Sequence, residues 1–133
     1  MSGWRGGHRR LLALPVALAL VSAVAGCVPS EQLPSTCNDP SVTISATLTA
    51  QRLDPATIEL CRNQQVTITV ASQADGELHF HGYDTEVPEQ EITSGQTITV
   101  KFTATHPGQF PIELHPADGS DEVQVGTLVV HEP

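Results

Sequence analysis

The histidines of this chain are the residues whose type and spacing could do chemistry. His79 and His81 lie two residues apart, and the apolar residues Leu78 and Phe80 alternate with them. Successive side chains of a β-strand point to opposite faces, so on a strand both imidazoles would project from the same face. Two imidazoles placed in this way can bind one metal ion, and imidazole suits copper, zinc or nickel. Two solvated histidines on a wet face also occur without a metal, so the spacing alone leaves both interpretations open.

The elements that must position these side chains are β-strands. Segments such as Ser41–Ala50 and Val66–Val70 alternate Val, Ile and Leu with Ser and Thr, which is the pattern of a strand with one buried face. We expect strands at residues 41–50, 57–60, 66–70, 77–83, 97–102, 109–115 and 123–130. Turn residues separate these segments, and none of them shows a convincing helical period. About seven short strands predict an all-β sandwich or barrel.

The first 26 residues have the pattern of an export signal. Three arginines and no acid precede the apolar run Leu11–Ala25, which is shorter than the roughly 20 residues that a membrane-spanning helix needs. A basic start, a short apolar run and small residues before a boundary are typical of a secretory signal. We therefore assign residues 1–26 to a signal peptide, 27–40 to a modified N-terminus and spacer, and 41–133 to the folded domain.

The end of this signal, Val24–Cys27, resembles the bacterial lipobox, in which the cysteine becomes the first mature residue and carries lipid. The resemblance implies that Cys27 is lipidated and that the protein is anchored to the extracytoplasmic face of the cell membrane. Several acyl chains give stable anchoring where a single chain would be marginal. The alternative is cleavage nearby, which would leave Cys27 as a spare thiol.

The mature chain would be strongly acidic. All 15 acidic residues follow Cys27, whereas only Arg52, Arg62 and Lys101 remain as bases, so loss of the signal changes the formal net charge from −9 to −12. Nucleic-acid binding requires Lys and Arg to neutralise phosphates, so this charge argues against a nucleic-acid partner. An acidic surface does raise the local concentration of cations.

Two cysteines remain once Cys27 is assigned to lipid. Exported proteins fold in an oxidising compartment, where an even pair of cysteines indicates a disulfide. We therefore predict a Cys37–Cys61 disulfide. The alternative is that both residues stay reduced and serve as metal ligands.

From Ile58 to Val130, the order of strands and turns resembles the cupredoxin domain of the plastocyanin and azurin superfamily. The most specific motifs are Pro107–Phe110 and the closing segment Gly126–Val130, together with the spacing between them. The resemblance implies a Greek-key β-sandwich of about seven strands whose metal-site loops gather at one end. It also implies a copper protein.

The chain departs from that family at the copper ligands. Leu114 stands where the family has its cysteine ligand, and the mature chain contains no Met to serve as the axial ligand. A blue-copper site needs a thiolate, two imidazoles and a weak axial ligand. Blue-copper electron transfer is therefore not the function that this sequence predicts.

The resemblance leaves three histidines near one end of the sandwich: His79, His81 and His115. Carboxylates that could join them are Glu77, Glu113 and Asp118. Such a set suits Cu(II), with Zn(II) as the alternative, and keeps a coordination position open. The other two mature histidines, His106 and His131, are expected to be solvated.

The function we expect is that of a membrane-anchored, extracytoplasmic copper-binding lipoprotein, for metal homeostasis or delivery. We expect no enzymatic activity, because the sequence shows neither a phosphate-binding loop nor a nucleophile elbow. The alternative is a metal-free β-sandwich that serves as an interaction module of the cell envelope, with a protein partner that the sequence does not identify.

The lipid anchor can be tested by replacing Cys27 with Ser, which removes the sulfur that would carry the lipid. We expect the Cys27→Ser protein to remain unprocessed or to become soluble. Membrane fractionation and intact-mass measurement check this. A variant that is still mature and membrane-bound would contradict the assignment.

Overall fold

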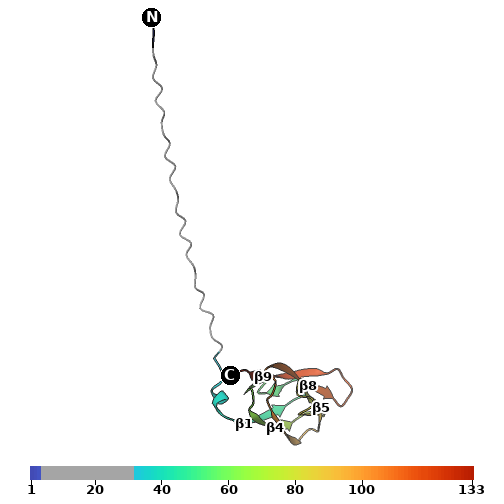
Figure 1. Cartoon of the computed structure of the whole chain (residues 1–133). Coiled ribbons are helices and arrows are strands. Elements are labelled where there is room, and N and C mark those ends of the chain that lie inside the picture. The colour runs from blue at the N-terminus through green and yellow to red at the C-terminus, as the bar shows by residue number, and fades with distance from the viewer. Residues whose placement is uncertain (4–31) are drawn as a thin grey trace. The chain divides into compact units, whose positions relative to one another are not determined.

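The computed structural model describes residues 1–3 and 32–133 (Figure 1). Apart from its first three residues, the expected signal peptide lies outside the described residues, and so does the expected lipidation site Cys27. Within the described part of the chain, no helix is both long and apolar enough to cross a membrane.

The described residues form nine strands and one short 3-10 helix, η1 (Ser35–Asn38). The strands are β1 (Ser41–Leu48), β2 (Leu53–Asp54), β3 (Thr57–Cys61), β4 (Gln65–Ser72), β5 (Gly76–Phe80), β6 (Gln90–Ile92), β7 (Thr97–Thr103), β8 (Gly108–Pro116) and β9 (Val123–His131). Each of the seven expected strands is present. The two additional strands, β2 and β6, contain two and three residues, too few to show a period in the sequence.

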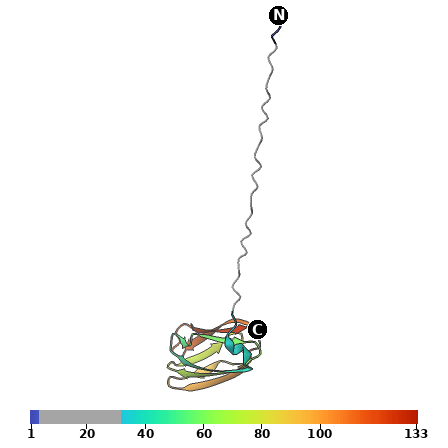
Figure 2. The same ribbon diagram turned by 90° about the vertical axis from the view of Figure 1, so that its left-hand side faces the viewer.

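The strands form two sheets, which confirms the predicted all-β sandwich (Figure 2). One sheet has the order β2-β1-β4-β7, and the other has the order β3-β9-β8-β5-β6. The β1–β4 and β3–β9 pairs are parallel and the remaining pairs are antiparallel. Because the chain passes repeatedly from one sheet to the other, strands distant in sequence lie side by side, as in Greek-key sandwiches.

The core lies between the two sheets and consists of the inward-facing residues of the alternating segments. On β4 these are Val66, Ile68 and Val70, and on β5 they are Leu78 and Phe80, all at most 2% exposed. Burying a side chain of this size contributes about 2 kcal/mol relative to leaving it in water. The alternation that predicted the strands is thus the same alternation that builds the core.

Strand β5 is shorter than the sequence indicated. We expected a strand over residues 77–83, but β5 ends at Phe80. Gly82 adopts a positive φ of 74°, a conformation that glycine accepts more readily than other residues, and the Tyr83 N–H bonds back to the carbonyl of Phe80 at 3.2 Å. His81 therefore lies at the start of a turn.

Tyr83 fixes this turn to the sandwich. Its ring is fully buried and packs edge-on against Phe110 at 5.3 Å between centroids. Its hydroxyl donates to the carbonyl of His106 at 2.7 Å and accepts from the His106 N–H at 3.0 Å. Burial raises the pKa of Tyr83, against the lowering effect of its bond with the His106 backbone, so the hydroxyl stays protonated and can keep donating.

The segment before β1 is attached to the sandwich by a disulfide and by one buried glutamine. The expected disulfide between Cys37 and Cys61 is formed. Gln64, only 3% exposed, accepts from the Cys61 N–H at 2.8 Å and donates to the carbonyls of Thr36 and Asp39 at 2.6 and 2.9 Å. The C-terminal part of the expected spacer, from η1 onward, thus packs against the domain, beside the C-terminus in both views (Figures 1 and 2).

Removing the disulfide should destabilise the domain. Cys37 and Cys61 are 24 residues apart in sequence, and closing a loop of that size stabilises a fold by about 3 kcal/mol in the chain-entropy model. We expect a Cys37→Ala/Cys61→Ala variant to lose a free energy of unfolding of about that size, measured by urea denaturation.

The matched control is the wild-type protein treated with a reductant, which should lose stability by a similar amount. Equal urea midpoints for the variant and the oxidised wild type would show that the bridge does not stabilise the fold.

Candidate metal centre

The pairing of β5 with β8 decides where the histidines lie. Leu78 stands opposite Leu114 in this register, and both side chains are fully buried in the core. Because side chains alternate along a strand, His79 and its opposite residue Glu113 must project from the other face of the sheet. The outer face of the five-stranded sheet therefore carries the candidate ligands.

Two local features adapt the sheet to this arrangement. Gly76 faces β8 so closely that a Cβ atom would lie 2.3 Å from the backbone oxygen of His115, so the strands meet here only because residue 76 is glycine. The pairing of β8 with β9 shifts between Ile112 and Glu113, which is a β-bulge beside the cluster. Bulges increase local twist and re-aim neighbouring side chains.

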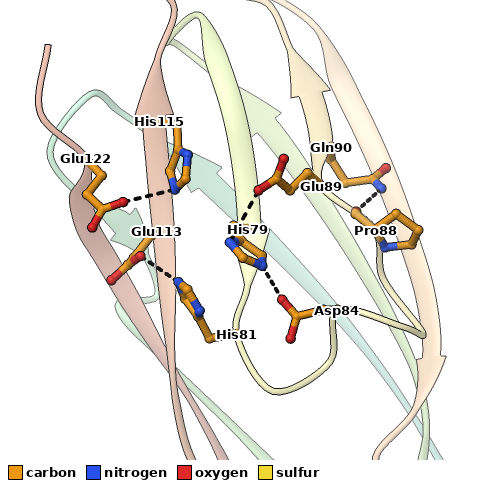
Figure 3. Close-up of polar contacts among 9 residues, drawn as sticks. All are labelled: His79, His81, Asp84, Pro88, Glu89, Gln90, Glu113, His115 and Glu122. Atoms are coloured by element: carbon orange, nitrogen blue, oxygen red, sulfur yellow. Dashed lines mark hydrogen bonds and ion pairs between the residues drawn. The ribbon is translucent and has the colours of Figure 1, made fainter. Parts of the chain in front are cut away.

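The three expected histidines come together (Figure 3). The ring of His79 lies 4.1 Å from that of His81 and 5.9 Å from that of His115, measured between centroids. We call these three residues the histidine cluster. His79 and His115 lie within β5 and β8, in the two strands where the sequence places them. Only His81 lies in a loop, and its N–H donates to the carbonyl of Pro111 at 3.1 Å, which holds it beside β8.

His79, at the centre of the cluster, lies between two carboxylates (Figure 3). Its Nε2 hydrogen-bonds to Asp84, and its Nδ1 lies 3.6 Å from Glu89. A neutral imidazole carries one hydrogen, so an Nε2–H that donates to Asp84 leaves the lone pair on Nδ1. That Nδ1 atom is buried and has no hydrogen-bond partner among the described residues.

The other two histidines also have carboxylate neighbours. His81 Nε2 lies 2.5 Å from Glu113, and His115 Nε2 lies 3.4 Å from Glu122 without forming a hydrogen bond. Glu113 is well shielded, with 19% of its side chain exposed, whereas Glu122 is 63% exposed. His115 also lines two surface hollows of about 600 and 590 Å³, whereas His79 and His81 line neither.

The donor atoms form two groups with the spacing of metal ligands. One comprises His79, His81 and Asp84, and the other comprises Glu113, His115 and Glu122. Within each group, one donor atom per residue lies within 4.8 Å of the others. Metal-bound histidines usually donate their second ring N–H to a carboxylate, as His79 and His81 do here. The residues therefore fit a copper or zinc ion held by imidazole, with carboxylates either as ligands or as hydrogen-bond partners of the ligands.

Some expected residues are elsewhere. Glu77 stands opposite His115 in the register but belongs to neither donor group. Asp118 caps its own turn, accepting from the N–H and hydroxyl of Ser120 at 2.9 and 2.6 Å. His106 is exposed, as expected. His131 is only partly exposed, and its Nε2 is buried without a hydrogen-bond partner in the described structure.

Three carboxylates of the cluster were missed by sequence reasoning: Asp84, Glu89 and Glu122. Each lies in a loop that the fold brings to the histidines, and Glu89 belongs to an acidic stretch with the pattern of a solvated surface. Asp84 alone carried a signal, because it follows His79 by five residues across a glycine turn.

A blue-copper centre does not fit this structure. Leu114, at the position of the family's cysteine ligand, is fully buried and faces the core, away from the histidine cluster. Cys37 and Cys61 are joined to each other. No thiolate is therefore available to the cluster in the part of the chain that the structure describes.

Comparison with known families finds a match to the family model described as "Cupredoxin-like domain", over residues 12–130. Comparison with curated proteins finds no match.

Solved structures with the same fold include copper proteins. The metal-binding domain of the Cu(I)-exporting P-type ATPase CopA of Streptococcus pneumoniae D39 has a TM-score of 0.53 at 17% identity, covering 71% of this chain and 89% of that one. A copper binding protein solved by NMR in its apo form gives 0.54 at 14% identity, covering 70% and 90%. The blue copper oxidase from Nitrosomonas europaea gives 0.56 at 15% identity, covering 69% of this chain and 39% of that chain. At these identities the similarity establishes the fold alone.

The bond between His79 and Asp84 can be tested by titration. Hydrogen bonding from His79 holds the pKa of Asp84 below its ordinary value, because that bond stabilises the ionised carboxylate. The stabilisation is therefore present above the unfolded-state pKa and is lost as the pH falls through the lower, folded-state pKa. We expect His79→Ala to raise the pKa of Asp84 towards its ordinary value, measured by NMR of the metal-free protein.

Asp118 is the internal control for that titration. Hydrogen bonds from Ser120 lower its pKa, and His79 is not involved. If His79→Ala leaves the pKa of Asp84 as low as in the wild type, the contact does not exist in solution.

Proposed function

Because this chain belongs to the cupredoxin-like domain family, we propose that it is a copper-binding protein of the cell envelope that serves copper homeostasis or delivery. The observation that carries the proposal is the histidine cluster on the outer face of the five-stranded sheet. Two of its ring nitrogens, His79 Nδ1 and His115 Nε2, are buried without a hydrogen-bond partner in the described structure. Such atoms are rare unless an ion or water satisfies them.

The chemistry of the donors favours copper. Imidazole binds copper, zinc and nickel, but among divalent ions the affinity of a given nitrogen and oxygen site is highest for Cu(II). Two of the similar structures are the metal-binding domain of a Cu(I)-exporting ATPase, with Cu(I), and a copper binding protein. Zinc is the alternative ion, since a set of histidines and a carboxylate also suits Zn(II).

Binding, rather than blue-copper electron transfer or catalysis, is the role we propose. Intense blue copper requires a thiolate ligand, and the cluster consists of imidazoles and carboxylates. The cluster lies on the outer face of the sheet, and His115 borders two surface hollows. These features support capture and release of an ion.

We also propose that lipid on Cys27 holds the protein at the extracytoplasmic face of the membrane. The order of basic start, apolar run and small residues before Cys27 supports this proposal. The spacer that follows would let the domain reach its partner or its metal source.

The second candidate is a metal-free interaction module. One observation favours it: His79 and His81 already hydrogen-bond to Asp84 and Glu113 without a metal. In that case the cluster would be a polar network on the sheet surface. The two candidates differ in whether the cluster binds copper.

Copper binding can be tested by calorimetric titration of the exported protein, purified in mild detergent, with Cu(II) and with Zn(II). We expect the double variant His79→Gln/His81→Gln to lose copper binding, because glutamine has similar size but lacks the imidazole donor. Acidification should weaken binding to the wild type, since protonated imidazole is no longer a ligand.

The matched control is His131→Gln, which replaces a partly buried histidine outside both donor groups and should leave copper binding unchanged. Circular dichroism should show the same β-sheet content in all variants. Equal copper affinity of the wild type and the double variant would favour the interaction module.

A further inference from the structure

Carboxylates outnumber imidazoles around the histidine cluster. Each of four carboxylates approaches a ring nitrogen to 3.6 Å or less: Asp84, Glu89, Glu113 and Glu122. We call these residues the four carboxylates. Asp84 and Glu89 come from the β5–β6 loop, Glu122 from the β8–β9 loop and Glu113 from β8, so the fold gathers negative charge from separate parts of the chain at one place.

The basic residues after Cys27 do not neutralise this charge. Arg52 pairs with Asp54 at 3.8 Å and Arg62 with Glu132 at 2.8 Å. Lys101 lies on β7, in the other sheet. With neutral imidazoles, the cluster and its carboxylates would therefore carry a charge of −4 that a bound cation can offset.

The negative potential of the four carboxylates favours divalent cations over monovalent cations. The Coulomb energy of a divalent ion beside a carboxylate is twice that of a monovalent ion at the same distance. At about 5 Å, the extra charge strengthens binding roughly fourfold per carboxylate at the dielectric constant of water, and more than a hundredfold at the effective value near a protein surface. The partial exposure of these side chains places the expected effect near the lower part of that range, at about tenfold for each carboxylate.

The chemical type of the donor atoms also favours Cu(II) over Cu(I). Soft thiolate and thioether ligands select Cu(I), whereas imidazole and carboxylate suit divalent ions. A carboxylate that accepts the second N–H of an imidazole also makes that imidazole a more basic ligand, and His79 and His81 have this arrangement with Asp84 and Glu113.

We propose that the histidine cluster is selective for the oxidation state of copper: the four carboxylates make it bind Cu(II) at least a hundredfold more tightly than Cu(I). This inference rests on the proposed function, because it assumes that copper binds at the cluster. It adds that the site binds copper less tightly once Cu(II) has been reduced to Cu(I), without any change in the protein.

The experiment measures both affinities on the exported protein in mild detergent. Competition with a Cu(II) chelator gives one constant in air, and competition with a Cu(I) chelator under anaerobic ascorbate gives the other. We expect Glu113→Gln and Asp84→Asn each to weaken Cu(II) binding about a hundredfold and Cu(I) binding only about tenfold, because the divalent ion loses twice the Coulomb energy. Both variants keep the size and a hydrogen-bond acceptor of the original side chain.

The matched control is Glu59→Gln, which removes the same charge from an exposed position on β3. Strand β3 lies two strands from β8 and three from β5 in the sheet, or about 10 and 14 Å at the usual strand spacing. That separation is as long as the Debye length at physiological salt or longer. Both constants should therefore stay within twofold of the wild type.

The outcomes separate the two proposals. Tighter binding of Cu(II), lost selectively in the two carboxylate variants, supports the inference. Equal or tighter binding of Cu(I), or equal losses for both ions in Glu113→Gln and Asp84→Asn, overturns the inference and leaves copper binding intact. If neither ion binds the wild-type protein, the proposed function fails and the inference fails with it.

Discussion

The pairing register of β5 with β8 is the constraint on which the candidate site depends. Leu78 opposite Leu114 and Phe80 opposite Ile112 fill the core, so the residues between them must face outward. A slip of one residue would move every side chain of the strand to the other face, bury His79 and expose Leu78. The hydrophobic core therefore specifies which face of the sheet carries His79 and Glu113.

The same register concentrates charge that the fold alone does not balance. Carboxylates that face one another repel, and the imidazoles relieve this only in part, through the bonds of His79 and His81 to Asp84 and Glu113. A cation bound to the folded protein, and not to the unfolded chain, would stabilise the native state in proportion to the logarithm of its concentration. At the proposed site, ion binding and folding would therefore be coupled. The disulfide and the Gln64 hydrogen bonds attach the segment before β1 to the sandwich, and they need no ion to do so.

Sequence reasoning found the long strands, the disulfide and the histidines, because each leaves a pattern that local rules can detect. Alternation identifies β4 and β5, cysteine parity identifies the bridge, and the spacing of His79 and His81 identifies a shared face. The carboxylate partners Glu89 and Glu122 were not predicted, since loops carry no period and their positions depend on the completed fold. The early end of β5 was missed for a related reason: the strand pattern continues to Tyr83, and only the turn at Gly82 interrupts it.

The location of the cluster also explains how a cupredoxin-like sandwich without the blue-copper ligands can still gather imidazoles and carboxylates at one place. Leu114 and His115 are neighbours on β8 and project to opposite faces, one into the core and one towards His79. A donor at position 114 would therefore not share an ion with the cluster without distortion of the strand. Side chains on the outer face of the five-stranded sheet do not have to pack into the core, so imidazoles and carboxylates can lie together there. In this arrangement the core keeps the sandwich folded with an apolar residue at position 114, while the ligand chemistry lies on the surface that the core orients.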